Sequence, residues 1–412
     1  MKTGVMAMKL IAGLTIFLTL LLFPCYAFAQ DAGSVEEVEI GIPDTWSSAL
    51  TRVPEDAQAD VIEAFELAGS NSDALVNTLL SVPDNWIPGA VFLIRYMPVE
   101  DLTVITERMF TDNLRCAYEV RATYPWCSEY DEETFLHYVL PMRVSQEPLE
   151  NWRPYFLEHL KPYLAEATNL DDAREAAGQW IWSLASFQQT QSRDQGPFET
   201  ISGGYGRCEE LMSLFIDGLR ACGIPARHAW TPYWTYQDNN HAWTEYLGGD
   251  LLWHCSDGWV PACAQRTAIV LSSSFGLMDE GQGNIYRNFD VPGARYSIID
   301  SIADYRDECN LTVKVIDISG NPMPETDVYI SIWNYGALRP IATGTTDDNG
   351  EWKIQIGPGG LFISAGDEIS GALEALQLPE VAEYMLELRL GLGAEVPPET
   401  LWLRYPNEGE AQ

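Results

Sequence analysis

Residues 203–260 read GGYGRCEELMSLFIDGLRACGIPARHAWTPYWTYQDNNHAWTEYLGGDLLWHCSDGWV, and this stretch decides the fold. Apolar residues recur at helical spacing over Glu209–Cys222, and the Gly-Ile-Pro that follows ends the helix. Three short alternating segments with turn residues between them then predict strands: Arg227–Tyr236, His241–Tyr246 and Leu251–Cys255. A helix followed by antiparallel strands predicts an α+β core, which we place at residues 188–300.

The residues before the core predict a helical region at 30–187. Apolar residues at helical spacing and acidic first turns give six expected helices: Pro54–Ala68, Ser72–Leu80, Trp86–Tyr96, Glu132–Leu140, Leu149–Leu164 and Asp171–Phe187. The polar segment Gln188–Ser202 carries Gly and Pro, so it predicts a loop into the core.

The residues after the core, 309–412, predict a small all-β sandwich. Short alternating segments are separated by turn signals, with expected strands at Leu311–Ile316, Asp327–Trp333 and Glu351–Ile356. Val381–Leu390 is compatible with a helix or a strand.

Charge excludes several classes of partner. The 412 residues contain 24 Lys+Arg and 60 Asp+Glu, for a net charge of -36. Nucleic acids and anionic membrane surfaces are bound by clusters of Lys and Arg, which this chain lacks. The apolar fraction of 46% is enough to build real cores, which argues against wholesale disorder.

The N-terminus predicts an extracytoplasmic protein. Lysines, an apolar run over Leu10–Tyr26 and the small-residue site Ala27-Phe28-Ala29 are typical of a signal peptide, here 1–29, and cleavage is expected after Ala29. The alternative is an uncleaved membrane anchor. We expect a secreted or periplasmic protein with no membrane association after cleavage.

The cysteines fit an oxidising compartment. Seven of the eight cysteines follow the expected cleavage site, and an odd number leaves at least one thiol unpaired. Cys116/Cys127 and Cys255/Cys263 are the local pairs that we favour, although spacing establishes neither.

Cys208 is the candidate nucleophile. It follows a glycine-rich run and stands at or just before the start of the predicted helix Glu209–Cys222. The positive end of a helix favours a thiolate, which is the reactive form of cysteine. Arg207 would add to this effect if its side chain turned toward the sulfur. The alternative is a buried structural cysteine.

His241 and Asp257 are the candidate partners of that thiol. His241 opens a predicted strand directly after a turn, and Asp257 follows the next strand. Adjacent antiparallel strands can bring the two together, and a carboxylate fixes the tautomer of a histidine base. Gln189 and Gln191 are suggested side-chain donors to an oxyanion.

Four motifs in order resemble the transglutaminase-like superfamily of papain-type thiol enzymes. They are Gly206-x-Cys208, Leu219–Arg227, His241-Ala242-Trp243-x-Glu245 and Trp253-x-x-x-Asp257. The resemblance covers about 203–260 and implies Cys208 as nucleophile, His241 as base and Asp257 as orienting acid. Gly258 stands where the family often has proline, which bears on the orienting acid alone.

The flanking regions carry weaker resemblances. Val139–Arg143 and Trp152-Arg153 resemble the leading region of secreted bacterial members. Thr346–Gly350 is similar to carboxypeptidase-regulatory or transthyretin-like β-sandwiches, which are accessory modules.

These observations predict a thiol enzyme that acts on amide or peptide bonds through a thioester. It would be a cysteine peptidase or amidase, or a protein-glutamine acyltransferase, and the resemblance favours hydrolysis. Its partner would be a peptide or protein substrate, with the cell envelope as one source. The alternative is a catalytically silent fold that binds peptides or glycans on its many aromatic residues. No cofactor and no metal site are expected, because zinc-type spacings are missing from the sequence.

Overall fold

The computed structural model describes residues 43–190, 193–256, 264, 266–278, 285–288 (main chain only), 295–366 and 370–391. The expected signal peptide, Asp257 and Cys263 lie outside the described residues. Among the described residues, no helix is both long enough and apolar enough to cross a membrane.

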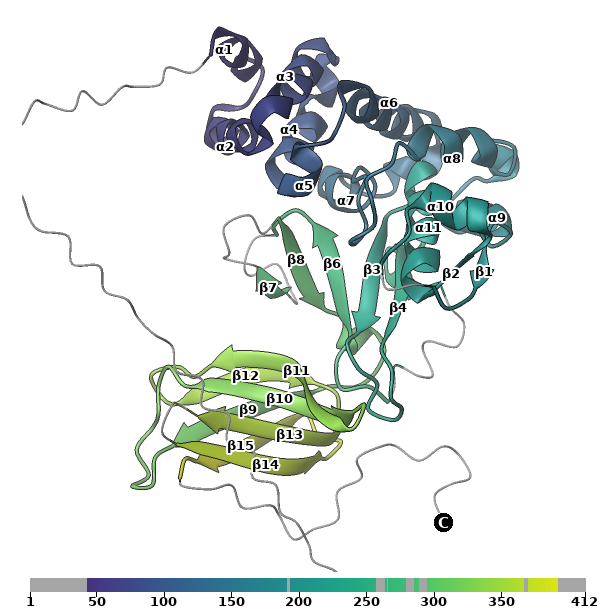
Figure 1. Ribbon diagram of the computed structural model, residues 1–412. Coiled ribbons are helices and arrows are strands. Elements are labelled where there is room, and N and C mark those ends of the chain that lie inside the picture. The colour runs from purple at the N-terminus through teal and green to yellow at the C-terminus, as the bar shows by residue number, and fades with distance from the viewer. Residues whose placement is uncertain are drawn as a thin grey trace, which may run out of the picture. The chain divides into compact units, whose positions relative to one another are not determined.

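The predicted helical region is confirmed (Figure 1). The described helices before the sheet are α1 (Asp44–Leu50), α2 (Gln58–Ala68), α3 (Ser72–Ser81), α4 (Ile87–Tyr96), α5 (Val99–Leu102), α6 (Glu107–Thr123), α7 (Glu132–Tyr138), α8 (Arg153–Leu160), α9 (Leu170–Ile181), α10 (Pro197–Gly203) and α11 (Cys208–Ala221). Their buried faces share one apolar core with α11 and one face of the central sheet.

Side-chain caps set where several of these helices begin. The Thr106 hydroxyl accepts the Met109 N–H at 3.2 Å ahead of α6. Ahead of α7, the Asp131 carboxylate accepts the Thr134 N–H. Ahead of α9, the Asn169 side-chain oxygen accepts the Asp172 N–H. Each cap satisfies a backbone donor that the helix itself leaves unpaired.

Three sequence expectations in this region are wrong. α6 occupies a segment for which no helix is predicted, and α10 lies inside the segment expected to be a loop. The expected helix Asp171–Phe187 ends at Ile181, and its last residues instead form β1 (Ser186–Phe187), which pairs in parallel with β2 (Tyr205–Gly206).

Helix α11 begins and ends as its sequence requires. The Glu210 carboxylate accepts the backbone N–H of Arg207 at 2.6 Å, which is half of a capping box. At the other end Gly223 has φ +75°, the left-handed conformation that glycine adopts without cost. Its N–H bonds to Arg220 O, and that of Ile224 bonds to Leu219 O, as in a Schellman motif.

The central sheet has six antiparallel strands in the order β5-β4-β3-β6-β8-β7. Its strands are β3 (Ala226–Thr231), β4 (His241–Leu247), β5 (Trp253–Cys255), β6 (Leu271–Phe275), β7 (Ile285–Asn288) and β8 (Tyr296–Asp300). The predicted helix on an antiparallel sheet is therefore confirmed, and Figure 1 shows α11 running beside β3 and β4.

Two buried arginines fasten the helical region to α11. The Arg153 guanidinium donates to Asn113 Oδ1, to Arg220 O and to the carbonyls of residues 139–141. Arg220 donates to the Ala226 and Arg143 carbonyls. Burial lowers the pKa of Arg153 to about 9 and that of Arg220 to about 10, so both remain charged at neutral pH, where carbonyl oxygens solvate them in place of water.

The C-terminal strands form two sheets with a shared apolar core, as in a small β-sandwich. One sheet has the order β11-β10-β13-β14 and the other β12-β9-β15. The strands are β9 (Cys309–Ile316), β10 (Asp327–Asn334), β11 (Ala337–Thr345), β12 (Glu351–Ile356), β13 (Gly359–Gly366), β14 (Gly371–Leu378) and β15 (Glu383–Arg389). The ambiguous segment Val381–Leu390 is thus a strand.

The expected pairing of Cys116 with Cys127 is wrong. Both carry free, buried thiols. Cys116 lies inside α6, whereas the Cys127 thiol is directed at Gly223 O, 3.6 Å away. The pairing of Cys255 with Cys263 is not tested, because Cys263 lies outside the described residues.

Candidate active site

Cys208 is the first residue of α11, and its side chain is partly exposed. Two glycines before Cys208 have conformations or contacts that exclude a side chain. Gly204 has φ +69°, and a Cβ added to Gly206 would lie 2.8 Å from the Glu210 Cβ. The Gln188 N–H donates to Gly206 O at 2.9 Å, which extends the β1–β2 pair. The backbone ahead of the thiol is therefore fixed on two sides.

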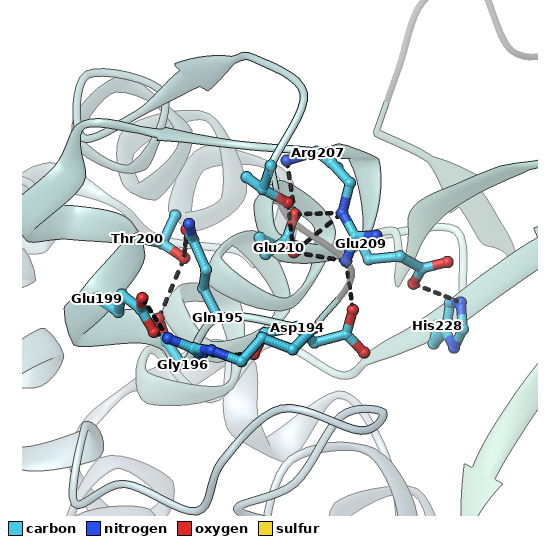
Figure 2. A network of polar contacts seen from close by, with 11 residues as sticks. Asp194, Gln195, Gly196, Glu199, Thr200, Arg207, Glu209, Glu210 and His228 are labelled. Atoms are coloured by element: carbon cyan, nitrogen blue, oxygen red, sulfur yellow. Dashed lines mark hydrogen bonds and ion pairs between the residues drawn. The ribbon is translucent and has the colours of Figure 1, made fainter.

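Arg207 does not turn toward the sulfur. Its guanidinium binds the Glu210 carboxylate at 2.7 Å and the Asp194 carboxylate at 2.5 Å (Figure 2). Arg207 therefore serves to hold the start of α11 against the segment that contains Asp194.

His241 is the first residue of β4, where Thr231 of β3 is its antiparallel partner. Its ring stacks on Trp243 at a centroid distance of 5.7 Å and on Trp234 at 6.1 Å. Both tryptophans are fully buried. The plane of the imidazole is thus set by two rigid neighbours.

The structure packs the helix of Cys208 directly against the strand of His241. The Thr244 hydroxyl donates to Met212 O at 3.3 Å, which joins β4 to the first turns of α11. His241 is also close enough to contribute to the pKa of Glu209, the residue after Cys208. The starts of α11 and β4 therefore lie within electrostatic reach of each other.

A buried ion pair joins β3 and β4 beneath the candidate site. Arg227 Nε lies 2.5 Å from Glu245 Oε2, and both side chains are almost completely buried. The Tyr305 hydroxyl donates to Glu245 Oε1 at 2.7 Å and accepts the Trp243 Nε1–H at 2.7 Å. This chain of contacts runs from Arg227 to the tryptophan that stacks on His241. Tyr305 was not identified from the sequence.

Asp257 is not placed. The pairing of β4 with β5 is described from Leu247↔Trp253 to Glu245↔Cys255, and the Ser256 N–H donates to Thr244 O at 2.9 Å. Asp257 lies outside the described residues.

A cleft of about 1040 Å³ is lined by the chain neighbours of Cys208 and His241. Arg207 and Glu209, which flank Cys208, line it, and so does Asn240, which precedes His241. Its aromatic lining consists of Tyr96, Trp230, Phe275 and Tyr296. Most of the other lining residues are polar or charged, among them Arg143, Glu147 and Asp194, so the cleft combines an aromatic part with a polar part.

Glu209 and His228 are cleft residues that sequence reasoning missed. Burial raises the pKa of Glu209 to about 7, and the nearby Asp194 carboxylate adds to this, while Arg207 opposes it. Burial lowers the pKa of His228 to about 3, so its ring is neutral. The two side chains approach to 3.7 Å (Figure 2), too far for a hydrogen bond, so we interpret them as a carboxyl in contact with a neutral imidazole.

The sequence offered one signal for His228. It lies three residues after the helix-ending Pro225 in an alternating strand, and the register pairs it with Thr244. Thr244 faces α11, so the same face of β3 directs His228 toward the start of that helix.

The other histidines have structural surroundings. His137 is buried, with Nδ1 2.6 Å from Phe275 O. His159 stacks on Trp180 on the helical region. His254 of β5 lies 2.8 Å from Asp250 Oδ1, which belongs to the turn before that strand.

The remaining site expectations are only partly placed. Gln189 is exposed and lines a second pocket of about 490 Å³ together with Gln188 and Tyr205, while Gln191 lies outside the described residues. Among the described side chains, no group of three or more His, Cys, Asp or Glu is arranged to hold a metal ion.

Residues 159–264 match the family model of the transglutaminase-like superfamily. A solved structure of a candidate cysteine protease from Cytophaga hutchinsonii shares 16% identity over 44% of this chain and 68% of its own, with a TM-score of 0.27. The Bacillus anthracis TIE protein shares 12% identity over 40% and 31% of the two chains, with a TM-score of 0.17.

No curated protein matches the chain. The family match does not extend to the C-terminal sandwich, whose resemblance to carboxypeptidase-regulatory modules stays a prediction. Residues 159–264, which hold both Cys208 and His241, are a transglutaminase-like superfamily domain.

Proposed function

We propose that this protein is a thiol enzyme that acts on amide or peptide bonds, with Cys208 as nucleophile and His241 as base. The observation that carries the proposal is the packing of α11, which Cys208 begins, against β4, which His241 begins. A nucleophile and a base at the ends of two packed elements, beside a cleft, are what covalent catalysis requires.

The chemistry follows from these two groups. His241 takes the proton of the Cys208 thiol, and the sulfur attacks the carbonyl carbon to form a C–S bond. The resulting oxyanion accepts a hydrogen bond from the Cys208 backbone N–H at the start of α11. His241 then returns the proton to the leaving nitrogen, and the C–N bond breaks to give a thioester.

Resolution of the thioester distinguishes two kinds of enzyme. In a hydrolase His241 takes a proton from water, the hydroxyl attacks the thioester carbon, and the C–S bond breaks. In a transferase an amine takes the place of water. We favour hydrolysis, on the sequence resemblance to bacterial peptidases and amidases.

Asp257 is the proposed orienting acid. It follows Ser256, whose backbone is bonded to β4, and it belongs to the fourth sequence motif. A carboxylate on the second ring nitrogen would select the tautomer and stabilise the imidazolium. The stacked rings of Trp234 and Trp243 would add a second restraint on His241.

The proposed substrate is a peptide or protein segment that binds in the cleft. We propose that the protein acts outside the cytoplasm, where peptides of the cell envelope are one source of substrate. Aromatic walls would contact its side chains, and the polar end near Glu209 and Asn240 would receive the reacting amide. We propose no cofactor.

Alkylation kinetics test the thiol–base pair. The whole mature chain is treated with iodoacetamide across pH 5–9, and labelling of Cys208 is followed by peptide mapping. We expect fast labelling in the wild type and a rate at least about tenfold lower at pH 7 in His241→Ala. His254→Ala is the matched control, because the His254 ring is partly exposed and bonds to the exposed Asp250 carboxylate. Equal rates in wild type and His241→Ala would refute the pair.

Substrate trapping then separates hydrolysis from transfer. The wild type and Cys208→Ala are incubated with peptide pools with and without added amines, and the products are analysed by mass spectrometry. New peptide termini that need Cys208 indicate hydrolysis. Release of ammonia with a gain of the amine's mass indicates transfer.

A binding module is the second candidate. The observation that favours it is the aromatic wall formed by Tyr96, Trp230, Phe275 and Tyr296, since such faces bind peptides and sugars. In that case Cys208 would label slowly, with no dependence on His241.

A further inference from the structure

The loop that leads into His241 also supplies one of the rings that stack on it. This loop, residues 232–240, joins β3 to β4, and its Trp234 is only 1% exposed. The Trp234 N–H donates to Asn239 O at 2.8 Å and so closes the loop on itself. The conformation of residues 232–240 therefore sets one of the two tryptophan rings that contact the imidazole.

The C-terminal sandwich holds this loop from outside. Asn334, at the end of β10, is fully buried, and its Nδ2 donates to Trp234 O and to Gln237 O, each at 2.8 Å. The Tyr335 N–H donates to Asp238 Oδ1 at 2.9 Å. These bonds link positions that lie nearly one hundred residues apart in the sequence.

The tip of the β10–β11 hairpin has an unusual backbone. Tyr335 has φ +49° and Gly336 has φ +71°, so both residues of the two-residue turn between Asn334 and Ala337 are left-handed, as in a type I′ turn. A bulky side chain rarely adopts this conformation. The Tyr335 hydroxyl donates to Asn239 Oδ1 at 3.2 Å, and this bond anchors the strained Tyr335 on the loop.

We propose that the β10–β11 hairpin is a positioning element for His241, with Asn334 as its central residue. Because Asn334 fixes the carbonyls of Trp234 and Gln237, it fixes the ring that stacks on the imidazole. The sandwich would then be part of the catalytic unit and more than an accessory module. This inference rests on the proposed function for its catalytic meaning, but the positioning itself can be measured separately.

The central variant is Asn334→Asp in the full mature chain. It keeps the size of the side chain and replaces the donating Nδ2 with an oxygen that repels the two loop carbonyls. Asp238→Ala is the second variant, because Asp238 is an exposed residue of the loop and accepts the Tyr335 N–H. Asp238→Asn keeps an oxygen acceptor and should behave as the wild type.

Thr346→Val is the structural control. Thr346 is buried in the sandwich, where its hydroxyl accepts the Thr326 N–H at 3.0 Å and donates to Met323 O. The variant therefore weakens the sandwich without touching residues 232–240.

Two readouts are used. The first is the ring resonance of His241 in histidine-labelled protein, which the aromatic ring of Trp234 shifts strongly; it is assigned by its loss in His241→Gln among the five histidines. The second is the rate of Cys208 alkylation as a function of pH. We expect Asn334→Asp and Asp238→Ala to move the resonance, and Asn334→Asp to slow alkylation about tenfold at pH 7.

The outcomes separate the two proposals. A moved resonance in both loop-contact variants, with an unchanged one in Thr346→Val, supports positioning even if alkylation proves independent of His241, in which case only the enzymatic function fails. An unmoved resonance in Asn334→Asp overturns the positioning role. The same holds if Thr346→Val moves the resonance as much as Asn334→Asp does.

Discussion

Replacing Glu209 with glutamine should stabilise the folded chain at pH 8 much more than at pH 5. Burial raises the pKa of this carboxyl from 4.5 to about 7. Between these values the folded state binds more protons than the unfolded state, so the free energy of unfolding of the wild type falls as the pH rises. The Glu209→Gln variant carries no such penalty, because an amide does not ionise.

The magnitude follows from the same shift. A difference of about 2.5 pKa units, at about 1.36 kcal/mol per unit, gives roughly 3.4 kcal/mol as an upper bound. The Glu209 side chain keeps 27% of its surface exposed, so solvent screening lowers the expected gain to about 2 kcal/mol between pH 5 and pH 8.

Urea unfolding at both pH values measures this gain, with wild type and variant compared at each. Glu66→Gln is the control, because Glu66 is exposed on α2 and its replacement changes the net charge equally. Other titrating groups, such as Asp300, whose pKa burial raises to about 7, affect all three chains and cancel in the difference. Parallel stability curves for wild type and Glu209→Gln would refute the assignment of a buried carboxyl.

Two further substitutions test the supports of the site. Arg227→Ala leaves its carboxylate partner buried without a counter-charge and should cost about 3–5 kcal/mol in urea unfolding; a loss below about 1 kcal/mol would contradict this. Gly206→Ala brings a Cβ to 2.8 Å from the Glu210 Cβ and should slow Cys208 alkylation several-fold. Gly203→Ala, where a Cβ meets only ordinary contacts, should leave that rate unchanged. Equal rates in the two variants would contradict the role given to the close approach at Gly206.

Local patterns predicted the elements that carry Cys208 and His241 almost to the residue. α11 shows a strong apolar periodicity, and Gly223 marks its end, because this glycine takes the left-handed conformation that ends a helix. β4 begins at His241 as expected, because the polar turn before it and the alternation within it are both local signals.

Elements held by distant contacts escaped prediction. α10 lies in a polar segment with no apolar periodicity, and it forms because Pro197 favours a first helical turn and Glu150 accepts the Phe198 N–H at 2.8 Å. The partner carboxylate comes from 48 residues earlier in the chain. No reading of residues 188–202 alone could supply it.

The same reason explains why the roles of His228 and Tyr305 were missed. His228 belongs to the cleft only because β3 pairs with β4 and both pack on α11. Tyr305 follows a short 3-10 helix after the sheet, and its contacts with Trp243 and Glu245 span sixty residues or more. Motif spacing identifies groups that react, whereas the groups that orient them are chosen by tertiary packing.

The proposed functional unit is therefore larger than the region that the family model matches. Residues 159–264 contain Cys208 and His241, but the hydroxyl that holds Trp243 belongs to Tyr305, and the amide that holds the Trp234 loop belongs to Asn334. The proposed base, His241, stacks on two tryptophans, so its orientation depends on the groups that fix those tryptophans. The Tyr305 hydroxyl and the Asn334 amide both lie C-terminal to residues 159–264. We therefore expect the orientation of His241 to depend on the sandwich and on the segment before it.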